Sequence, residues 1–265
     1  MWKEKLTQFR QYLILNDIKP DNYLSTIKTI GKILQWDFSQ EKITDMFVNF
    51  DKSIETYNMY IKALKRWSDC FNLNLQLPKI KRVERKLPQF IELEYIEKEI
   101  IPRLPYIFGK DLALKVKAIL LFLFYTGIRK SELITLKRNK INLLQRKAYI
   151  YEVKKKRERI VFFPEKVAEI LVEYFKSEEE KLNAFNLTKE RLAYIFRKLK
   201  ENFPEIKEAL HPHSLRHSFA VHCIRKGIPI SILKDMLGHS TIKTTLRYVE
   251  VDEKMMEEFY RKYIR

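Results

Sequence analysis

Five residues in the second half of the chain have types and spacings that could do chemistry together. They are Arg129, His213, Arg216, His239 and, close to the C-terminal end, Tyr248. Arginines keep their charge at every relevant pH and can hold two oxygens of one phosphate. Histidines bind or move protons, and a tyrosine hydroxyl can attack phosphorus to form a covalent bond. The combination predicts cleavage of a phosphodiester through a phosphotyrosine.

Local sequence signals indicate how these side chains are placed on helices. Positions three apart share one face of a helix, so we expect His213 and Arg216 to point into one site. Pro212 suits the start of that helix, whose N-terminus favours a phosphate. Gly238 suits the end of the next helix, and we expect the turn there to present His239 outward.

The attacking group and the leaving group both need assistance. A phenol has a pKa of about 10, so Tyr248 attacks poorly at neutral pH unless a base or positive charge lies beside it. The 5′ oxygen of the broken bond leaves as an alkoxide unless an acid protonates it. One of Lys154, Lys155 and Lys156, at the tip of an expected hairpin, could be that acid. The alternative for each lysine is a solvated basic turn that touches the backbone of the substrate.

Other interpretations of the same residues stay open at the level of sequence. Arg129 lies at a helix junction, where it could instead cap the carbonyls of the preceding helix. The spacing of His211, His213 and His217 is compatible with metal ligands, but no acidic or cysteine ligand lies nearby in the sequence. We therefore expect no metal site, and we interpret His211, His217 and His222 as structural histidines.

The elements that must position these residues are predicted to be mostly helical. Apolar residues recur at helical spacing through the first part of the chain, which predicts an all-helical module with helices over 3–16, 21–36, 40–50 and 54–71. In the second part, the same criterion predicts helices over 92–104, 111–125, 130–137, 165–176, 188–202, 214–226, 230–237, 241–248 and 252–263.

A small antiparallel sheet is expected in the middle of the second part. Residues 148–153 and 159–163 are rich in β-branched and aromatic side chains, which favour strands. Residues 154–158 separate them and would form the tip of a hairpin, and residues 141–144 are a candidate third strand. The predicted fold class is therefore mainly α, with an all-helical domain and an α+β catalytic domain.

The composition indicates a polyanionic partner. The net charge is +18, and the chain contains no long apolar run that would span a membrane. The N-terminus lacks an apolar signal region and there are only two cysteines, so we expect a cytoplasmic protein without a disulfide framework. Residues 78–88 have a proline at each end and five basic residues, which predicts an extended linker along a DNA backbone. The expected DNA contacts are Lys79, Lys81, Arg82, Arg85, Lys86, Lys155 and Lys156.

Taken together, these motifs resemble those of the tyrosine recombinases, the family of integrases and Xer-type recombinases. Residues 126–133 are similar to the first arginine motif of that family, and residues 213–217 to its second motif. Residues 237–240 match the third motif, and Tyr248 follows His239 by nine positions, as the nucleophile does in the family. The order and spacing of the motifs are specific together, and the resemblance covers nearly the whole chain.

The resemblance implies a role for each residue of the set. Arg129 and Arg216 would hold the phosphate, His213 would accept a proton, His239 would donate a hydrogen bond to the phosphate, and Tyr248 would attack. Glu132 would support Arg129 as a neighbouring carboxylate. The hairpin lysine of the family aligns best with Lys154, although Lys155 and Lys156 remain contenders because the flanking glycines of the family are absent.

The resemblance also implies an architecture and an assembly. Residues 1–77 would form a helical core DNA-binding domain, 78–88 the linker and 89–265 the catalytic domain, together a C-shaped clamp around double-stranded DNA. Such enzymes act as homotetramers on two DNA sites, and the free protein could be a monomer or dimer. A final helix over 252–264 is apolar enough to dock into a neighbouring subunit, the alternative being a helix packed on its own domain.

The sequence therefore predicts a site-specific recombinase that needs neither a metal nor ATP, because the covalent intermediate retains the energy of the broken bond. One rival is a type IB topoisomerase, which shares this chemistry without bringing two DNA sites together. Another is a DNA-binding protein without activity. The expectation of no additional N-terminal domain favours a simple Xer-type system over integration of a mobile element, but the DNA target is not predicted.

Overall fold

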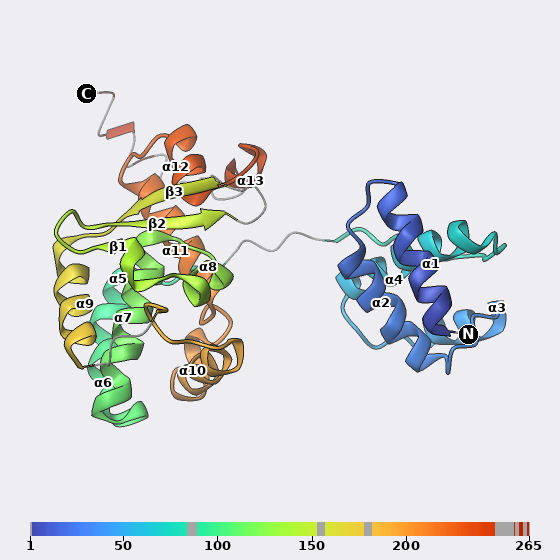
Figure 1. Ribbon diagram of the computed structural model, residues 1–265, viewed down its shortest axis with the longest axis horizontal. Helices are drawn as coiled ribbons and strands as arrows, with labels where there is room; N and C mark the ends of the chain where they lie inside the picture. The colour runs from blue at the N-terminus through green and yellow to red at the C-terminus, as the bar shows by residue number, and fades with distance from the viewer. Residues whose placement is uncertain are drawn as a thin grey trace. The chain divides into compact units, whose positions relative to one another are not determined.

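The computed structural model describes residues 2–83, 89–152, 157–177 and 182–246, together with residues 257, 260, 261 and 264. The chain divides into two compact units, Met1–Lys86 and Leu87–Arg265 (Figure 1). Tyr248, the lysines at 154–156 and two of the predicted DNA contacts in the linker, Arg85 and Lys86, lie outside the described residues. Most of the predicted final helix lies outside them as well.

The first unit is built from helices, as the apolar spacing predicts. Its helices are α1 (Trp2–Leu15), α2 (Pro20–Ile33), α3 (Gln40–Val48) and α4 (Ile54–Phe71). The core contains Phe9 from α1, Ile27 and Ile30 from α2, and Leu64 and Trp67 from α4, all almost fully buried. The apolar stripe of α4 thus faces the core, and the predicted small helical module is confirmed for the described residues.

The chain that follows α4 is held against that helix by one side-chain amide. The backbone N–H of Lys81 donates to Oδ1 of Asn58 at 2.8 Å, and Nδ2 of Asn58 donates to the Lys81 carbonyl at 2.7 Å. The Lys81 ammonium lies 4.2 Å from the ring centroid of Tyr57. Residues 78–83 have no helix or strand, as expected for the first part of the linker.

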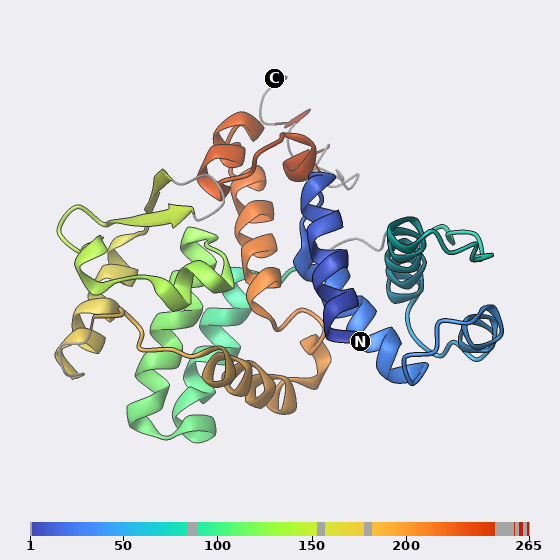
Figure 2. The same cartoon turned by 45° about the vertical axis from the view of Figure 1, so that its right-hand side comes forward.

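The second unit surrounds one buried helix, α7 (Lys110–Thr126), with the other elements. The helices that precede and follow the sheet region are α5 (Leu93–Tyr95), η1 (Ile96–Ile100), α6 (Ile101–Phe108), α8 (Lys130–Thr135), η2 (Arg138–Lys140), α9 (Glu165–Ser177), α10 (Lys189–Asn202), η3 (Pro204–Ile206), α11 (Pro212–Arg225), α12 (Ile230–Leu237) and α13 (Lys243–Leu246). Because α7 packs against α6, α9 and α11, its side chains are apolar on almost every face (Figures 1 and 2).

The helical run after the linker differs from the prediction of one helix over 92–104. It continues to Phe108 and contains a π-helical turn, η1, that ends two positions before Pro102. Neither Pro102 nor Pro105 has an N–H to donate, so the regular ladder of the α-helix cannot pass through them unchanged.

A small antiparallel sheet is present, in the strand order β1-β2-β3. Its strands are β1 (Ile141–Asn142), β2 (Lys147–Glu152) and β3 (Arg157–Phe162), and Glu152 pairs directly with Arg157. The predicted hairpin is confirmed, except that Arg157 and Glu158 belong to β3 and not to its tip. One register pair, Ile150 with Arg159, directs Arg159 toward the buried face of the sheet.

In the described part of the chain, no helix is both long and apolar enough to cross a membrane.

Candidate active site

The site is organised around the C-terminal end of α12, which is contacted by Arg216 from α11. Arg216 is 4% exposed, and its Nη2 donates to the Leu237 carbonyl at 2.6 Å. Its Nη1 donates to the Gly127 carbonyl, just past the end of α7, also at 2.6 Å. Helix C-termini carry partial negative charge and unsatisfied carbonyls, so they bind a guanidinium well. Arg216 therefore ties the ends of two helices together.

Arg129 reaches the next carbonyl of the same turn. Its Nη2 donates to the Gly238 carbonyl at 3.1 Å, and its Nη1 donates to Oε1 of Glu132 at 2.8 Å. The backbone N–H of Arg129 donates to Oε2 of Glu132 at 2.7 Å, which caps the start of α8. The alternative that Arg129 caps the preceding helix differs from the structure, in which Arg129 contacts Glu132 and the end of α12, and Arg216 donates to the Gly127 carbonyl after α7. About a third of the Arg129 side chain remains exposed.

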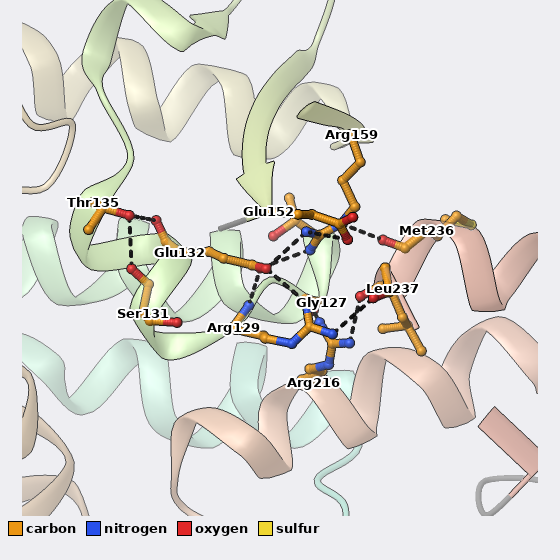
Figure 3. A network of polar contacts seen from close by, with 12 residues as sticks. Gly127, Arg129, Ser131, Glu132, Thr135, Glu152, Arg159, Arg216, Met236 and Leu237 are labelled. Atoms are coloured by element: carbon orange, nitrogen blue, oxygen red, sulfur yellow. Dashed lines mark hydrogen bonds and ion pairs between the residues drawn. The ribbon is translucent and has the colours of Figure 1, made fainter. Parts of the chain in front are cut away.

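A third arginine binds a carbonyl at the same end of α12. Arg159, on β3, donates through Nε to the Met236 carbonyl at 3.1 Å. Its Nη1 and Nη2 donate to the two oxygens of Glu132 at 3.0 and 2.8 Å, and Nη1 lies 3.5 Å from Oε1 of Glu152. Three successive carbonyls, of residues 236 to 238, thus each accept a hydrogen bond from a different arginine (Figure 3).

Two glycines make this close packing possible. Gly127 and Gly238 end α7 and α12 with φ of 57° and 67°, in the left-handed region that favours glycine. A Cβ at Gly127 would lie 2.3 Å from Cδ1 of Phe219, and a Cβ at Gly238 would lie 1.9 Å from Oε1 of Glu152. Any larger residue at Gly238 would displace the Glu152 carboxylate from the network.

Glu132 is the negative centre of the network and is buried. Burial by itself would raise the pKa of its carboxyl group. The hydrogen bonds and charge of Arg159, together with the backbone and side chain of Arg129, outweigh burial and lower the pKa of Glu132 to about 2. Glu132 is therefore ionised at neutral pH and holds both arginines by charge-assisted hydrogen bonds. The structure thus brings Glu132 to Arg129, as the sequence predicts.

His213 lies beside the arginines, and its side chain is partly exposed and partly covered by protein. Desolvation, followed by the positive charges of Arg216, Lys130 and Arg129, lowers the pKa of His213 below its ordinary value. The ring is therefore neutral at pH 7 and able to accept a proton. α11 begins at Pro212, as the sequence predicts for the helix start.

His239 is placed differently from the prediction. The sequence predicts a turn that presents this side chain outward, whereas His239 is 7% exposed. Its Nδ1 lies 2.8 Å from Oγ1 of Thr245 on α13, so the short helix after the turn folds back over the ring. The contact between residues 239 and 245 fixes the orientation of the imidazole.

Two of the remaining histidines, His211 and His222, have structural contacts, and the structural interpretation of His217 stays a prediction. Nδ1 of His211 accepts a hydrogen bond from the Ser214 backbone at 3.0 Å and thereby caps α11. The His222 ring packs edge-on against Phe124. Within the described ranges, no three His, Cys, Asp or Glu side chains are grouped so that they could hold a metal ion.

Arg159 and Glu152 are the two residues of this network that the sequence analysis does not single out. A signal is present, because both are charged residues at positions of the hairpin that alternate with exposed residues. Arg159 follows the exposed Glu158 and precedes the exposed Ile160. When a strand has one buried and one exposed face, a charged residue at a buried position indicates that its side chain is paired with another charged or polar group.

Comparison with known proteins identifies the family. The sequence profile of the phage integrase family matches residues 94–255. A tyrosine recombinase of Thermosipho africanus is 28% identical over 256 residues, which are 94% of this chain and 87% of the relative. Tyrosine recombinase XerA of Pyrococcus furiosus is 29% identical over 217 residues, covering 78% of this chain and 73% of the relative. The chain therefore belongs to the phage integrase family, and the predicted resemblance to the tyrosine recombinases, with the enzyme class that it implies, is confirmed.

Solved structures have the same fold. XerH site-specific recombinase, bound to a palindromic difH substrate in a post-cleavage complex, aligns with a TM-score of 0.67 and 19% identity, covering 93% of this chain and 80% of that chain. The Tn1549 transposon integrase in complex with a circular intermediate DNA aligns with a TM-score of 0.67 and 17% identity, covering 97% and 99%. The predicted fold class, mainly α with a small antiparallel sheet, is confirmed.

Proposed function

We propose that this protein is a site-specific recombinase that cuts and rejoins double-stranded DNA at a phosphate held by Arg129 and Arg216. The observation that carries the proposal is that both guanidinium groups are fixed on neighbouring carbonyls, of Leu237 and Gly238. Fixed donors stabilise the charge of a transition state without a cost of reorganisation, and such electrostatic stabilisation is usually the largest part of catalysis. The neutral His213 beside them supplies a proton acceptor.

The proposed reaction proceeds in two reversible steps. The Tyr248 hydroxyl attacks the phosphorus, the P–O bond to the 5′ oxygen breaks, and a 3′-phosphotyrosyl bond forms. His213 accepts the proton of the phenol, and His239 donates a hydrogen bond to a non-bridging oxygen. A lysine among 154–156, with Lys154 as the first candidate, gives a proton to the leaving 5′ oxygen. The 5′ hydroxyl of the partner duplex then attacks the phosphotyrosine and releases Tyr248.

The DNA would be bound outside the reacting phosphate by exposed basic residues. The side chains of Lys79, Lys81 and Arg82 are exposed on the first part of the linker, and a basic segment of this kind binds the phosphate backbone without regard to sequence. Arg85, Lys86, Lys155 and Lys156 are proposed to extend this contact. We assign residues 1–77 to DNA binding, 78–88 to the linker and 89–265 to catalysis.

The proposed active assembly is a homotetramer on two DNA sites, formed from free monomers or dimers, with the helix over 252–264 docked into a neighbouring subunit. A DNA substrate would place the protein in the cytoplasm. Named relatives include Xer recombinases and, among the structural neighbours, a transposon integrase. The proposal therefore concerns the recombinase reaction, which resolution of chromosome dimers and integration of a mobile element share.

A nicked suicide substrate tests the proposal. The nick allows a short 5′-hydroxyl fragment to diffuse away after cleavage, so the covalent complex accumulates and can be counted on a denaturing gel. We expect the wild-type protein to form the adduct and Tyr248→Phe to bind the same DNA without forming it. A persistent adduct in Tyr248→Phe would place the nucleophile elsewhere. Relaxation of plasmids without any specific site, by a monomer, would favour a type IB topoisomerase.

A further inference from the structure

The arginine that the sequence analysis does not single out connects the two parts of the proposed chemistry. One part is the phosphate-binding arginine Arg129, and the other is the hairpin whose residues 154–156 include the proposed acid. Arg159 contacts Glu132, which is the carboxylate partner of Arg129, and Glu152, which lies at the base of the hairpin (Figure 3). It lies almost fully buried between these carboxylates and also donates to the Met236 carbonyl.

The first connection runs through Glu132. Arg159 holds both oxygens of Glu132, at 3.0 and 2.8 Å, and the same two oxygens accept from the side chain and backbone of Arg129. A bidentate pair fixes the plane of the carboxylate as well as its position. The direction in which Arg129 points therefore depends on Arg159, although the two arginines are 30 positions apart in the sequence.

The second connection runs through Glu152. This carboxylate lies 3.5 Å from Nη1 of Arg159 and 3.1 Å from Nε of Arg157, which is its register partner across the hairpin. Glu152 is buried and packs on Gly238, so it fixes the end of β2 against the turn that binds Arg129. Lys154, which lies outside the described residues, follows Glu152 by two positions in the sequence.

We propose that Arg159 is a positioning residue that sets the distance between the phosphate-binding arginine and the acid-bearing hairpin. Proton transfer requires heavy atoms about 2.6–3.2 Å apart, so a small shift of the hairpin base would separate the acid from the leaving oxygen. A misplacement of about 1 Å can cost roughly 100-fold in rate. The inference rests on the proposed function, because it needs a lysine acid on residues 154–156 and a phosphate at Arg129.

The test separates the two connections by changing the leaving group. A 5′-bridging phosphorothiolate leaves as a thiolate, which needs no acid, so this substrate restores cleavage only where the acid is lost. Single-turnover cleavage would be measured on the ordinary and the phosphorothiolate substrate. The variants are Glu152→Gln, which changes the hairpin base, Glu132→Gln, which changes the support of Arg129, and Arg159→Met, which changes both.

We expect Glu152→Gln to be slowed about 10-fold or more on the ordinary substrate and to approach the wild-type rate on the phosphorothiolate. Glu132→Gln should be slowed on both substrates alike. Arg159→Met should be slowed about 100-fold or more on the ordinary substrate and only partly restored. If Arg159→Met and Glu152→Gln fold, bind DNA and are slowed equally on both substrates, Arg159 does not position the acid and the proposal is overturned.

A matched control distinguishes positioning from the general loss of an arginine that caps a helix. Nη2 of Arg138 donates to the Phe175 carbonyl near the end of α9 at 2.9 Å, and the Arg138 guanidinium stacks on the Phe175 ring. We expect Arg138→Met to lose thermal stability without a change in the ratio of the two cleavage rates. An equal change of that ratio in Arg138→Met would reduce Arg159 to a structural role.

Two further results keep this proposal separate from the proposed function. If the wild-type protein forms no covalent adduct, the proposed function fails and the positioning role fails with it. If the wild type forms the adduct but a triple Lys154→Ala, Lys155→Ala, Lys156→Ala variant is not restored by the phosphorothiolate, the acid lies elsewhere. The recombinase reaction would then stand, whereas the connection through Glu152 would be overturned.

Discussion

The basic residues of the linker and the arginines at the end of α12 carry the same charge but have opposite surroundings. Lys79 and Arg82 are exposed on a segment without helix or strand. Arg216 is almost fully buried, and both of its terminal nitrogens donate to carbonyls. Exposed cations attract a polyanion by releasing counterions, which requires no fixed geometry. A guanidinium fixed by protein carbonyls acts on one phosphate at one position.

The comparison shows that net charge and catalytic charge are separate properties of this chain. In the described part of the linker, residues 78–83, Lys81 is held through its backbone, which Asn58 binds through two hydrogen bonds. At the end of α12 the relation is reversed, because backbone carbonyls hold the side chains of Arg129, Arg159 and Arg216. The same kind of hydrogen bond therefore positions a chain segment in one unit and a cationic group in the other.

The largest effect should come from loosening a fixed arginine. Arg216→Lys keeps the charge but cannot donate to the Gly127 and Leu237 carbonyls with the geometry of a guanidinium. We expect the single-turnover cleavage rate to fall about 100- to 1000-fold, while the affinity for DNA changes only slightly. Cleavage of a nicked substrate and a binding assay measure the two quantities. A loss of affinity as large as the loss of rate would mean that Arg216 acts like the linker cations.

Removing the charge of Glu132 should affect stability in a manner that depends on pH. Its pKa is about 2 in the folded state, compared with an ordinary value of 4.5. Because the folded pKa is the lower one, the stabilisation is complete above about pH 4.5 and is lost as the pH falls through 2. We expect Glu132→Gln to lower the free energy of unfolding by about 3 kcal/mol at pH 7. Urea unfolding at pH 7 and near pH 3 should show a smaller difference between the two proteins at the lower pH.

A moderate effect should follow from changing the charge around His213. The positive charges of Arg216, Lys130 and Arg129 contribute to lowering the pKa of His213. Lys130→Gln removes one of these charges and should raise that pKa, since protonation becomes easier. The acid limb of the pH profile for cleavage should therefore shift toward higher pH in Lys130→Gln. A shift in the opposite direction, or none, would argue against His213 as the proton acceptor.

The smallest effect on the reaction should come from the linker. In the double variant Lys79→Gln, Arg82→Gln, we expect weaker binding and a slope of log affinity against log salt that falls by about 1 for each residue removed. The cleavage rate at saturating protein should fall far less than in Arg216→Lys. A salt titration of binding checks the slope, and an unchanged slope would show that these residues do not contact phosphate.

Individual residues show which features of the site can be predicted from the sequence. The helix that carries His213 and Arg216 starts at Pro212 as predicted, because its signals are local. The prediction that His239 points outward is wrong. The ring is buried by a contact with Thr245, six positions further on, and that contact depends on how the chain after the turn folds back. Arg159 was not singled out, since a strand pattern indicates a buried charge but does not name its partner. The positions of Tyr248 and Lys154 stay predictions.

The sequence by itself determined which groups are available, in which order they occur and on which elements they lie, because periodicity, prolines and glycines act over a few residues. Only the tertiary structure decided that three arginines meet at one helix end. The hydrogen bonds that bring them there join residues 77 positions apart for Arg159, 109 for Arg129 and 21 for Arg216. Such bonds require α11 and β3 to pack beside α12, because the carbonyls at its end are then withdrawn from water and need protein donors.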